Sequence, residues 1–236
     1  MKIALLGYGK MGQSIAEIAK EQNHNIVYKT NNKPDFEQVK KADVAIEFSI
    51  PEVAFYNISE CIKHQIPVIS GTTGWLDKFD TAKKLAKQHQ SKFLYASNFS
   101  IGVNLFFKLN TMLAKIMKTQ QDYKVDISEI HHLEKKDAPS GTAISLAKQI
   151  IEHSDYKTWS HPPKSNNNLD IPIEAYREKG IFGTHIISYK SKIDDIEIKH
   201  TAHSRKGFAL GAVLAAEWLV NHNKYGCFDM SDVLNI

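Results

Sequence analysis

The sequence predicts an α/β protein in which an open parallel sheet is followed by an α+β domain, and two observations support this. In the first hundred residues, short apolar runs alternate with helical patterns, which is typical of βαβ units. After residue 100, a long helical pattern is followed by runs in which apolar and polar residues alternate, which is typical of strands with one covered face. A length of 236 residues allows one or two domains of ordinary size.

The first part is expected to contain five buried strands, because strands covered on both faces are continuously apolar. The helix after the first strand places Ile15, Ile18 and Ala19 on one face. A second helix opens at Pro51, a residue tolerated in the first turn. The expected strands are residues 3–6, 25–29, 44–46, 67–69 and 93–95, and a third helix is expected over residues 77–89.

The second part is expected to begin with a long helix and to continue with strands. A final helix over residues 208–220 is apolar on all sides, so we expect it to be buried and to return to the first part. The expected domains are residues 1–100 with 206–236, and residues 101–205. The elements expected between are a helix over 103–117, a strand over 123–131, a helix over 142–152, an irregular stretch over 160–170 with Pro162 and Pro163, and strands over 171–177, 184–190 and 195–202.

Composition excludes several classes of partner. Thirty basic and 26 acidic residues give a net charge of +4 that is spread along the chain, so we expect no nucleic-acid partner. No apolar run is long enough to cross a membrane, so we expect no membrane partner. Cys61 and Cys227 form no motif, which indicates a cytoplasmic protein. Because Arg177 and Arg205 are the two arginines of the chain, any bidentate grip on an anion must come from them.

A glycine motif lies between the first expected strand and its helix. Gly7 permits a tight turn, Gly9 allows close approach of a pyrophosphate, and Gly12 allows helix and strand to pack closely. The helix N-terminus supplies N–H groups for the phosphates. A simple connecting turn is the alternative, but the position favours dinucleotide binding and a Rossmann-type domain. The expected contact residues are Gly7, Tyr8, Gly9, Lys10, Met11 and Gly12.

The end of the second expected strand bears on the choice of cofactor. Many dinucleotide sites place an acidic residue there to hold the adenosine ribose. Here the strand end carries Lys29, Asn31 and Lys33 and no carboxylate. A 2′-phosphate is therefore not repelled, and we expect NADPH or NADH, with NADPH used at least as well.

Two further loops lie on the carboxyl edge of the expected sheet, where open α/β folds bind ligands. Residues 71–74 read GTTG, and their backbone and hydroxyls could close over a nicotinamide ribose; a plain strand–helix turn is the alternative. Residues 97–100 read SNFS, and Phe99 with the amides could form one wall of the ring pocket.

The densest chemistry lies in residues 129–142. A metal site with His131, His132 and Glu134 is disfavoured, because adjacent residues on a strand face opposite sides, so we expect no metal. Ser140 could be a nucleophile, but its position before an apolar run is typical of a helix N-cap. The N–H groups and hydroxyls of a helix that opens at Ser140 and Thr142 would suit a substrate carboxylate.

The loop is similar to that of the dihydrodipicolinate reductase family, and the resemblance extends over nearly the whole chain. The loop sequence is highly specific, whereas the glycine motif alone is not. The matching segments are residues 131–143 (HHLEKKDAPSGTA), 7–12, 47–49 (EFS), 71–74, 97–104 (SNFSIGVN), 183–185 (GTH) and 200–205 (HTAHSR).

The resemblance implies a role for each matching residue. It implies that His131 gives or takes a proton, that Lys135 donates one, and that His132 with Gly141 and Thr142 binds a dicarboxylate. We add Ser140 to the substrate set from the N-cap argument. We expect Arg205 to bridge the domains or clamp the nicotinamide loop, with a helix-capping charge as the alternative. The remaining cofactor contacts implied are Gly71, Thr72, Thr73, Ala96, Ser97, Asn98 and Phe99.

The implied reaction is reduction of 4-hydroxy-tetrahydrodipicolinate by NAD(P)H with loss of water, in the diaminopimelate route to lysine, by a homotetramer built through a shared C-terminal sheet. The chain departs from the family at Asn31, which lacks the ribose acid, at Ser97, where alanine is commoner, and in a shorter segment between the second and third strands. A non-catalytic dinucleotide sensor, a metal-dependent hydrolase and a dehydrogenase acting on another imine remain alternatives.

Overall fold

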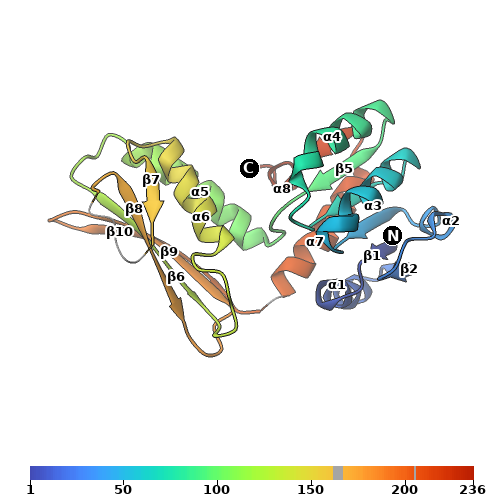
Figure 1. Ribbon diagram of the computed structural model, residues 1–236, viewed down its shortest axis with the longest axis horizontal. Coiled ribbons are helices and arrows are strands. Elements are labelled where there is room, and N and C mark those ends of the chain that lie inside the picture. Colours follow the sequence, from blue (N-terminus) through green and yellow to red (C-terminus); the bar gives the residue numbers. More distant parts are fainter. Residues whose placement is uncertain (162–166, 205) are drawn as a thin grey trace. The chain divides into compact units, whose positions relative to one another are not determined.

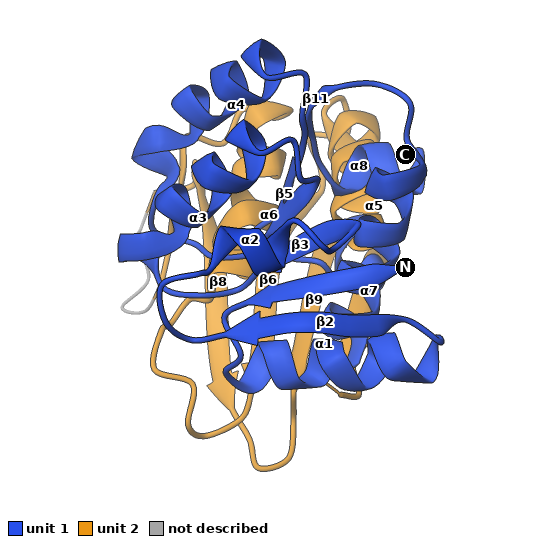
Figure 2. Ribbon diagram, turned by 90° about the vertical axis from the view of Figure 1, so that its right-hand side faces the viewer, with its two compact units in different colours: residues 1–104, 206–236 blue, residues 105–205 orange. Residues whose placement is uncertain are grey.

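The chain folds into two compact units in the computed structural model, which describes residues 1–161, 167–204 and 206–236. Unit 1 contains residues 1–104 and 206–236, and unit 2 contains residues 105–205 (Figures 1 and 2). The expected fold class, a parallel-sheet domain and an α+β domain, is confirmed. Arg205 and part of the expected irregular stretch at 160–170 lie outside the described residues.

Unit 1 is built on a six-stranded parallel sheet with the strand order β11-β5-β4-β3-β1-β2. The three-residue strand β11 and the short helices α2 and α8 were not expected, because segments this short carry no readable period. The strands are β1 (Lys2–Leu6), β2 (Asn25–Thr30), β3 (Val44–Glu47), β4 (Val68–Ser70), β5 (Lys92–Tyr95) and β11 (Gly226–Phe228). The helices are α1 (Lys10–Glu21), α2 (Phe36–Val39), α3 (Pro51–Lys63), α4 (Phe79–Gln88), which follows a 3₁₀ turn at Leu76–Lys78, α7 (Lys206–Asn221) and α8 (Met230–Leu234).

The sheet of unit 1 is covered on both faces, and the alternation along β1 shows how. Ile3 and Leu5 point into a core shared with α1 and α7, whereas Ala4 and Leu6 point into a second core shared with α3 and α4. All four side chains are fully buried, which explains why the strand reads as a continuous apolar run. Because both faces are covered, the carboxyl edge of the sheet is left for ligands.

Helix α7 belongs to unit 1 although it follows unit 2 in the sequence (Figure 2). Its small residues allow it to lie close to the segment after β5. A Cβ atom added to Gly211 would lie 1.7 Å from the carbonyl oxygen of Phe99, so this position accepts no side chain without a backbone shift. Helix α7 thereby packs directly against the loop that follows β5.

Unit 2 contains a five-stranded mixed sheet with the order β10-β9-β6-β8-β7. β9 runs antiparallel to both β6 and β10, and β8 runs parallel to β6 and β7. The three-residue strand β7 was not expected. The elements are α5 (Ile101–Met117), which starts in unit 1, β6 (Lys124–His131), α6 (Gly141–Glu152), β7 (Thr158–Ser160), β8 (Asp170–Arg177), β9 (Gly183–Lys190) and β10 (Asp195–Ala202).

The core of unit 2 lies between α5 and α6 and one face of this sheet. Val125 and Ile127 of β6 pack there with Leu146 of α6 and Phe106 of α5. Because β6 alternates, Glu129 lies on this same inner face further along the strand, and it is also fully buried. An acidic side chain thus occupies a core position where the alternation along β6 predicts an apolar residue.

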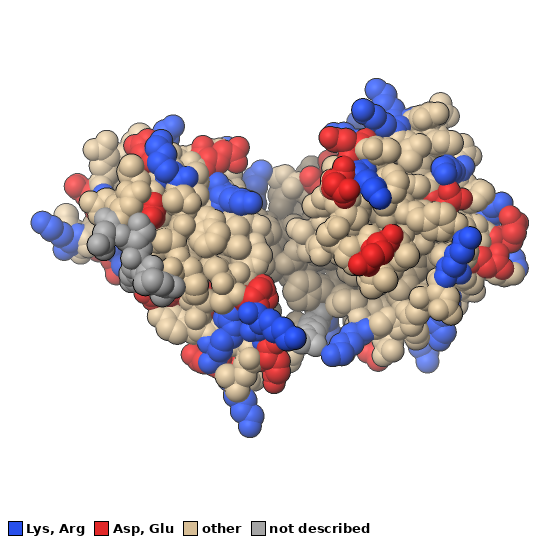
Figure 3. Space-filling model, in the orientation of Figure 1, with Lys and Arg blue, Asp and Glu red and all other residues tan. Residues whose placement is uncertain are grey.

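The surface carries charge of both signs. On the face shown in Figure 3, basic and acidic side chains are interspersed over both units. Within the described ranges, no helix combines the length and the apolar character that crossing a membrane requires.

The contact at Gly211 gives a test of the packing of α7. Gly211→Ala should lower the free energy of unfolding by about 1–3 kcal/mol, because the added methyl group overlaps the Phe99 backbone. Gly207→Ala is the matched control on the same helix, since its added Cβ meets only Ser100 Oγ at 3.7 Å. Denaturant unfolding followed by circular dichroism measures both. Equal stability of the two variants would contradict the packing described here.

Candidate active site

The glycine turn between β1 and α1 has the geometry of a phosphate site. Gly7 adopts φ +103°, and a Cβ atom there would lie 2.0 Å from the carbonyl oxygen of Phe48. Gly9 is the N-cap of α1, with no side-chain cap and no atom within 4 Å of an added Cβ. The first turn of α1 therefore offers backbone N–H groups that no side chain satisfies, together with open space beside them. These residues fit the pyrophosphate of a dinucleotide.

The end of β2 contacts this turn directly. The Oδ1 atom of Asn31 accepts a hydrogen bond from the Tyr8 amide at 2.5 Å. The ammonium of Lys29 lies 4.4 Å from the centroid of the Tyr8 ring. The neutral Asn31 thus occupies the strand end where an acidic residue would hold a ribose, with a lysine beside it.

The two other edge loops meet at Phe48, which follows β3. A Cβ atom on Gly71 would lie 2.2 Å from the Phe48 ring, and the rings of Phe48 and Phe99 have centroids 5.5 Å apart. Phe99 is 2% exposed and belongs to the core of unit 1, so it supports the edge from within. Ser97 is exposed and Asn98 half-buried, whereas Ala96, like Phe99, is buried.

The predicted substrate residues lie at the end of β6 and the start of α6, and a buried carboxylate joins the two elements. Glu129 Oε1 accepts the Ser140 amide at 2.9 Å. Glu129 Oε2 lies 3.5 Å from His185 Nε2 and 3.7 Å from His131 Nδ1. Burial would raise the pKa of Glu129, but hydrogen bonds from His185 and Ser140 outweigh it and lower the pKa to about 2. The site therefore contains an ionised carboxylate at neutral pH.

His131, the last residue of β6, is held in its neutral form. Burial lowers its pKa to about 4, although the Glu129 charge acts in the opposite direction. Its ring lies edge-on to His185, with centroids 5.1 Å apart. Gly183 makes room for the imidazole, because a Cβ atom there would lie 3.2 Å from His131 Nε2. At neutral pH, His131 is thus a neutral proton acceptor rather than an imidazolium.

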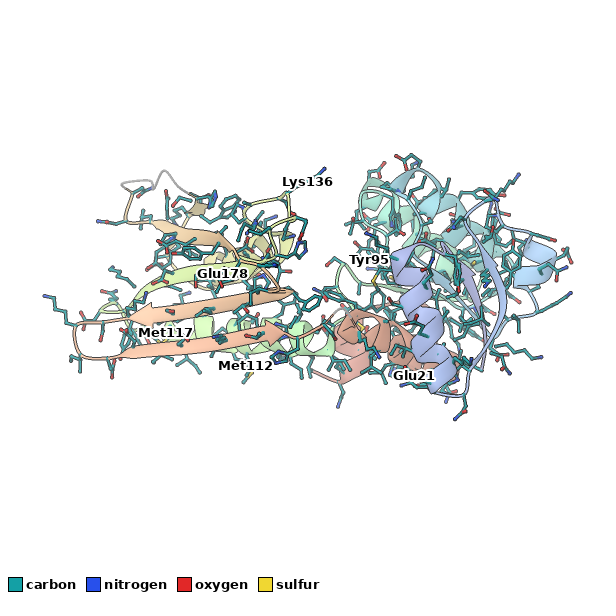
Figure 4. All side chains as sticks on the ribbon, turned by 90° about the horizontal axis from the view of Figure 1, so that it is seen from below. Glu21, Tyr95, Met112, Met117, Lys136 and Glu178 are labelled. Atoms are coloured by element: carbon teal, nitrogen blue, oxygen red, sulfur yellow. The ribbon has the colours of Figure 1, made fainter. Side chains whose placement is uncertain are left out.

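The loop after His131 carries paired charges. Lys135 Nζ donates to both oxygens of Asp137, at 2.8 and 3.0 Å. His132 Nδ1 lies 2.9 Å from Glu134 Oε2. Lys135 is partly buried, whereas the adjacent Lys136 is exposed and extends away from unit 2 (Figure 4). The two neighbouring lysines therefore differ in their surroundings.

Arg177 fixes this loop to β8. Its guanidinium donates to the carbonyl oxygens of Lys135 and Asp137, at 3.3 and 2.5 Å, and lies 3.7 Å from Glu129. The ladder extends past β8, because the Glu178 amide donates to the His131 carbonyl at 2.8 Å (Figure 4). The path of the loop is thus set by strand pairing and by one arginine.

The N-terminus of α6 has free backbone amides that could bind an anion. Ser140 is the N-cap, and its Oγ accepts the Ala143 amide at 3.2 Å. The amides of Gly141 and Thr142 precede Ala143 in the first turn, where the helix has no carbonyl to offer them. A Cβ atom on Gly141 would meet nothing within 4 Å. These two amides can therefore bind a carboxylate.

The geometry of Ser140 speaks against a nucleophile. Its Oγ lies 3.2 Å from His185 Nε2, which is the same nitrogen that faces Glu129. A Ser–His–acid relay needs the two different ring nitrogens. Ser140 is also 2% exposed, and its oxygen already caps α6. Its oxygen acts as an N-cap rather than as a nucleophile, and its part in substrate binding stays a prediction.

The described residues that could hold a metal ion are not the set considered in the sequence analysis. Ligand atoms of Glu129, His131 and His185 lie within 4.8 Å of one another. His132 and Glu134 are outside this set, as the alternation along a strand predicts. The Ser140 amide already donates to Glu129, and the Ser140 hydroxyl lies 3.2 Å from His185 Nε2.

Sequence reasoning assigned no role to Glu129 or His185 in this site, and it named Arg177 only as a candidate for a bidentate contact with an anion. Glu129 could have been found, because it lies two residues before His131 and so shares its face of the strand. His185 pairs with Glu129 across β9, and Arg177 pairs with His131 across β8. These two pairings depend on strand register, which the sequence does not reveal.

Comparison with known proteins identifies the family of this chain. The family model for the N-terminal part of dihydrodipicolinate reductase matches residues 1–99, and the model for its C-terminal part matches residues 102–234. The chain is 54% identical to 4-hydroxy-tetrahydrodipicolinate reductase from Christiangramia forsetii, over 100% of this chain and 98% of the relative.

Solved structures show the same fold. A dipicolinate-bound dihydrodipicolinate reductase from a Paenisporosarcina species superposes with a TM-score of 0.82 at 23% identity, over 97% of each chain. Scyllo-inositol dehydrogenase from Lactobacillus casei has a TM-score of 0.55 at 13% identity, over 100% of this chain and 88% of that one. Two family models that together cover nearly all residues, with a full-length relative at 54% identity, show that the chain belongs to the dihydrodipicolinate reductase family.

Proposed function

We propose that this chain reduces 4-hydroxy-tetrahydrodipicolinate to tetrahydrodipicolinate with NAD(P)H, in the diaminopimelate route to lysine. NAD(P)H gives a hydride, one proton is taken up, and NAD(P)⁺, water and the reduced ring leave. The observation that carries the proposal is a buried carboxylate, Glu129, that lies beside His131 and accepts the Ser140 amide at the open N-terminus of α6, with Lys135 on the loop between them. The full-length relative that carries the same reductase name supports it.

Unit 1 binds the nicotinamide dinucleotide, which supplies the hydride when bound. The first turn of α1 would hold the pyrophosphate, and the loops at 71–73 and 96–99 would hold the nicotinamide half. The neutral Asn31 at the end of β2 supports NADPH as well as NADH, because no carboxylate there repels a 2′-phosphate.

Unit 2 binds the dicarboxylate. One carboxylate would be bound by the Gly141 and Thr142 amides at the positive end of α6, and His132 would contact the substrate beside them. The dipicolinate bound by the Paenisporosarcina relative is a planar dicarboxylate of this kind. Lys135, now paired with Asp137, would turn its ammonium to the ring nitrogen, where negative charge develops during hydride addition.

His131 then takes or gives a proton according to the charge beside it. Burial lowers its pKa to about 4. A bound dianion adds negative charge, which favours the imidazolium and moves this pKa upward. We therefore propose that substrate binding sets the protonation state of His131 for catalysis.

The alternatives fit the site less well. A non-catalytic sensor would not need His131, Lys135 and an anion site on the other unit. A metal-dependent hydrolase that uses His132 and Glu134 lacks support, since these residues are outside the described group that could hold a metal.

We propose a cytoplasmic homotetramer assembled through the sheet of unit 2. In the described part of unit 2, α5 and α6 cover one face of that sheet, which leaves the other face for a partner subunit (Figure 1). Cys61 and Cys227 are unpaired thiols, which is usual in a reducing compartment.

The first test is consumption of NADPH with substrate formed in situ from aspartate semialdehyde and pyruvate. The wild-type protein should turn over, and Lys135→Ala should lower kcat about a hundredfold, the usual scale for a positioned acid. Lys136→Ala is the matched control and should retain wild-type kcat, because that side chain is exposed. NADPH binding, measured by fluorescence, should be unchanged in both. Wild-type turnover in Lys135→Ala would refute the role of this loop.

Binding of the dicarboxylate is tested separately. His132→Ala removes the imidazole, and Thr142→Ala removes the hydroxyl beside the anion-binding amides. Each should raise KM for the substrate about tenfold with little change in kcat, since each loses a side-chain contact made equally in the ground and transition states. Leu133→Ala, on the same loop and 61% exposed, should leave KM unchanged. A fall in kcat at constant KM would assign His132 or Thr142 to the chemical step instead.

The choice of cofactor depends on the charge at the end of β2. Asn31→Asp keeps the acceptor for the Tyr8 amide and adds a negative charge, so it should shift the ratio of kcat/KM about tenfold toward NADH. Asn23→Asp, beyond the other end of α1, adds the same charge and should leave the ratio unchanged. A wild-type protein that strongly prefers NADH would show this interpretation of Asn31 to be wrong.

A further inference from the structure

Glu47, the last residue of β3, is a fully buried carboxylate in unit 1 that the proposed chemistry does not use. β3 lies between β1 and β4 in the middle of the sheet, with Glu47 opposite Leu6 on one side and Ser70 on the other. The side chain is therefore placed at the carboxyl edge, between the glycine turn and the loop at 71–74.

Four hydrogen bonds reach this carboxylate from two strand ends. Oε1 accepts the Ser49 amide and the Thr72 hydroxyl, each at 3.0 Å, and also a short bond from the Ser49 hydroxyl. Oε2 accepts the Ser70 hydroxyl at 2.7 Å. Both oxygens are thus used, and the donors come from the last residue of β4 and from the segments that follow β3 and β4.

The bonds determine where Thr72 points. The Thr72 hydroxyl gives its proton to Glu47, and its oxygen accepts the Ser49 amide at 2.9 Å. On the other side, the Thr72 carbonyl accepts the Trp75 indole N–H at 2.7 Å. Thr72 is 6% exposed and held from both sides, so its place depends on the carboxylate.

No described lysine, arginine or histidine forms an ion pair with Glu47. Burial raises its pKa, while the hydrogen bonds from Ser49, Ser70 and Thr72 act in the opposite direction. A buried carboxylate without a cation is a poor way to stabilise a fold, since an apolar residue of similar volume does so at least as well. The Glu47 carboxylate instead fixes the orientation of the groups that donate hydrogen bonds to it.

The topology indicates which half of the dinucleotide these donors serve. The pyrophosphate site lies at β1, and β2, with Asn31, lies on one side of β1. β3, β4 and β5 lie on the other side. A dinucleotide with its adenosine over β2 has its nicotinamide half over the loops that follow β3 and β4.

We infer that Glu47 is a positioning residue for the nicotinamide half of the dinucleotide. It holds Thr72, and with it the loop at 71–73, in the position in which this loop contacts the nicotinamide ribose. This inference rests on the proposed function, because it takes the dinucleotide as the ligand of unit 1. Glu47 acts through Thr72 and Ser49 and touches no reacting atom.

The test compares the whole cofactor with its adenosine half. Glu47→Gln keeps the size of the side chain but can no longer accept all four bonds. It should raise the Kd for NADPH at least tenfold and change the Kd for 5′-ADP less than twofold, because 5′-ADP reaches only the glycine turn and the end of β2. Fluorescence titration with NADPH and competition with 5′-ADP measure the two constants.

Two further variants make the result decisive. Ser70→Ala removes one donor and leaves the carboxylate, so it should show the same selective loss on a smaller scale, about threefold, in a protein that folds even if Glu47→Gln does not. Ile62→Val is the stability control, since Ile62 is fully buried on α3 away from both loops. It should lower the melting temperature without changing either Kd.

Equal weakening of NADPH and 5′-ADP, or weakening of NADPH by Ile62→Val to the extent seen with Glu47→Gln, would overturn the inference. Unchanged NADPH binding in Glu47→Gln would also overturn it. The proposed function fails differently: in that case the wild-type protein itself binds no NADPH and shows no turnover.

Discussion

The hydrogen bond from the Ser140 amide to the Glu129 carboxylate is the interaction on which the substrate side of this protein depends. It joins the end of β6, which carries His131, to the start of α6 across the loop 132–139, which contains His132 and Lys135. Without this bond, the buried amide and the buried carboxylate oxygen would each lack a partner, at a cost of about 1–3 kcal/mol each. One contact therefore holds the N-terminus of α6 beside the strand end that carries His131.

Each unit uses a buried carboxylate for a related purpose, with different neighbours. Glu129 lies among histidines and near an arginine, so it is ionised and affects the protonation of His131. Glu47 is surrounded by hydroxyls and an amide, so it orients donors without an ion pair among the described residues. The first arrangement suits proton transfer, and the second suits the shaping of a loop.

Much of this could be predicted from local patterns, and the rest depends on pairing. The alternation along residues 124–131 predicts that Glu129 and His131 share a face, and the Ser-Gly-Thr sequence predicts the N-cap at Ser140. Their neighbours Arg177 and His185 come from strands 40 to 60 residues further along, whose register depends on packing of the whole sheet. The contact of Asn31 with Tyr8 likewise could not be predicted from the sequence, because it joins the end of β2 to the glycine turn after β1.

We propose that the dicarboxylate binds at the N-terminus of α6 in unit 2 and that the dinucleotide binds at the sheet edge of unit 1. Backbone amide chemical shifts of the isotope-labelled protein, recorded in separate titrations with dipicolinate and with NADPH, test both placements directly. Dipicolinate should shift the Gly141 and Thr142 amides, and NADPH should shift those of residues 7–12. Saturating dipicolinate that leaves Gly141 and Thr142 unmoved would contradict this proposal.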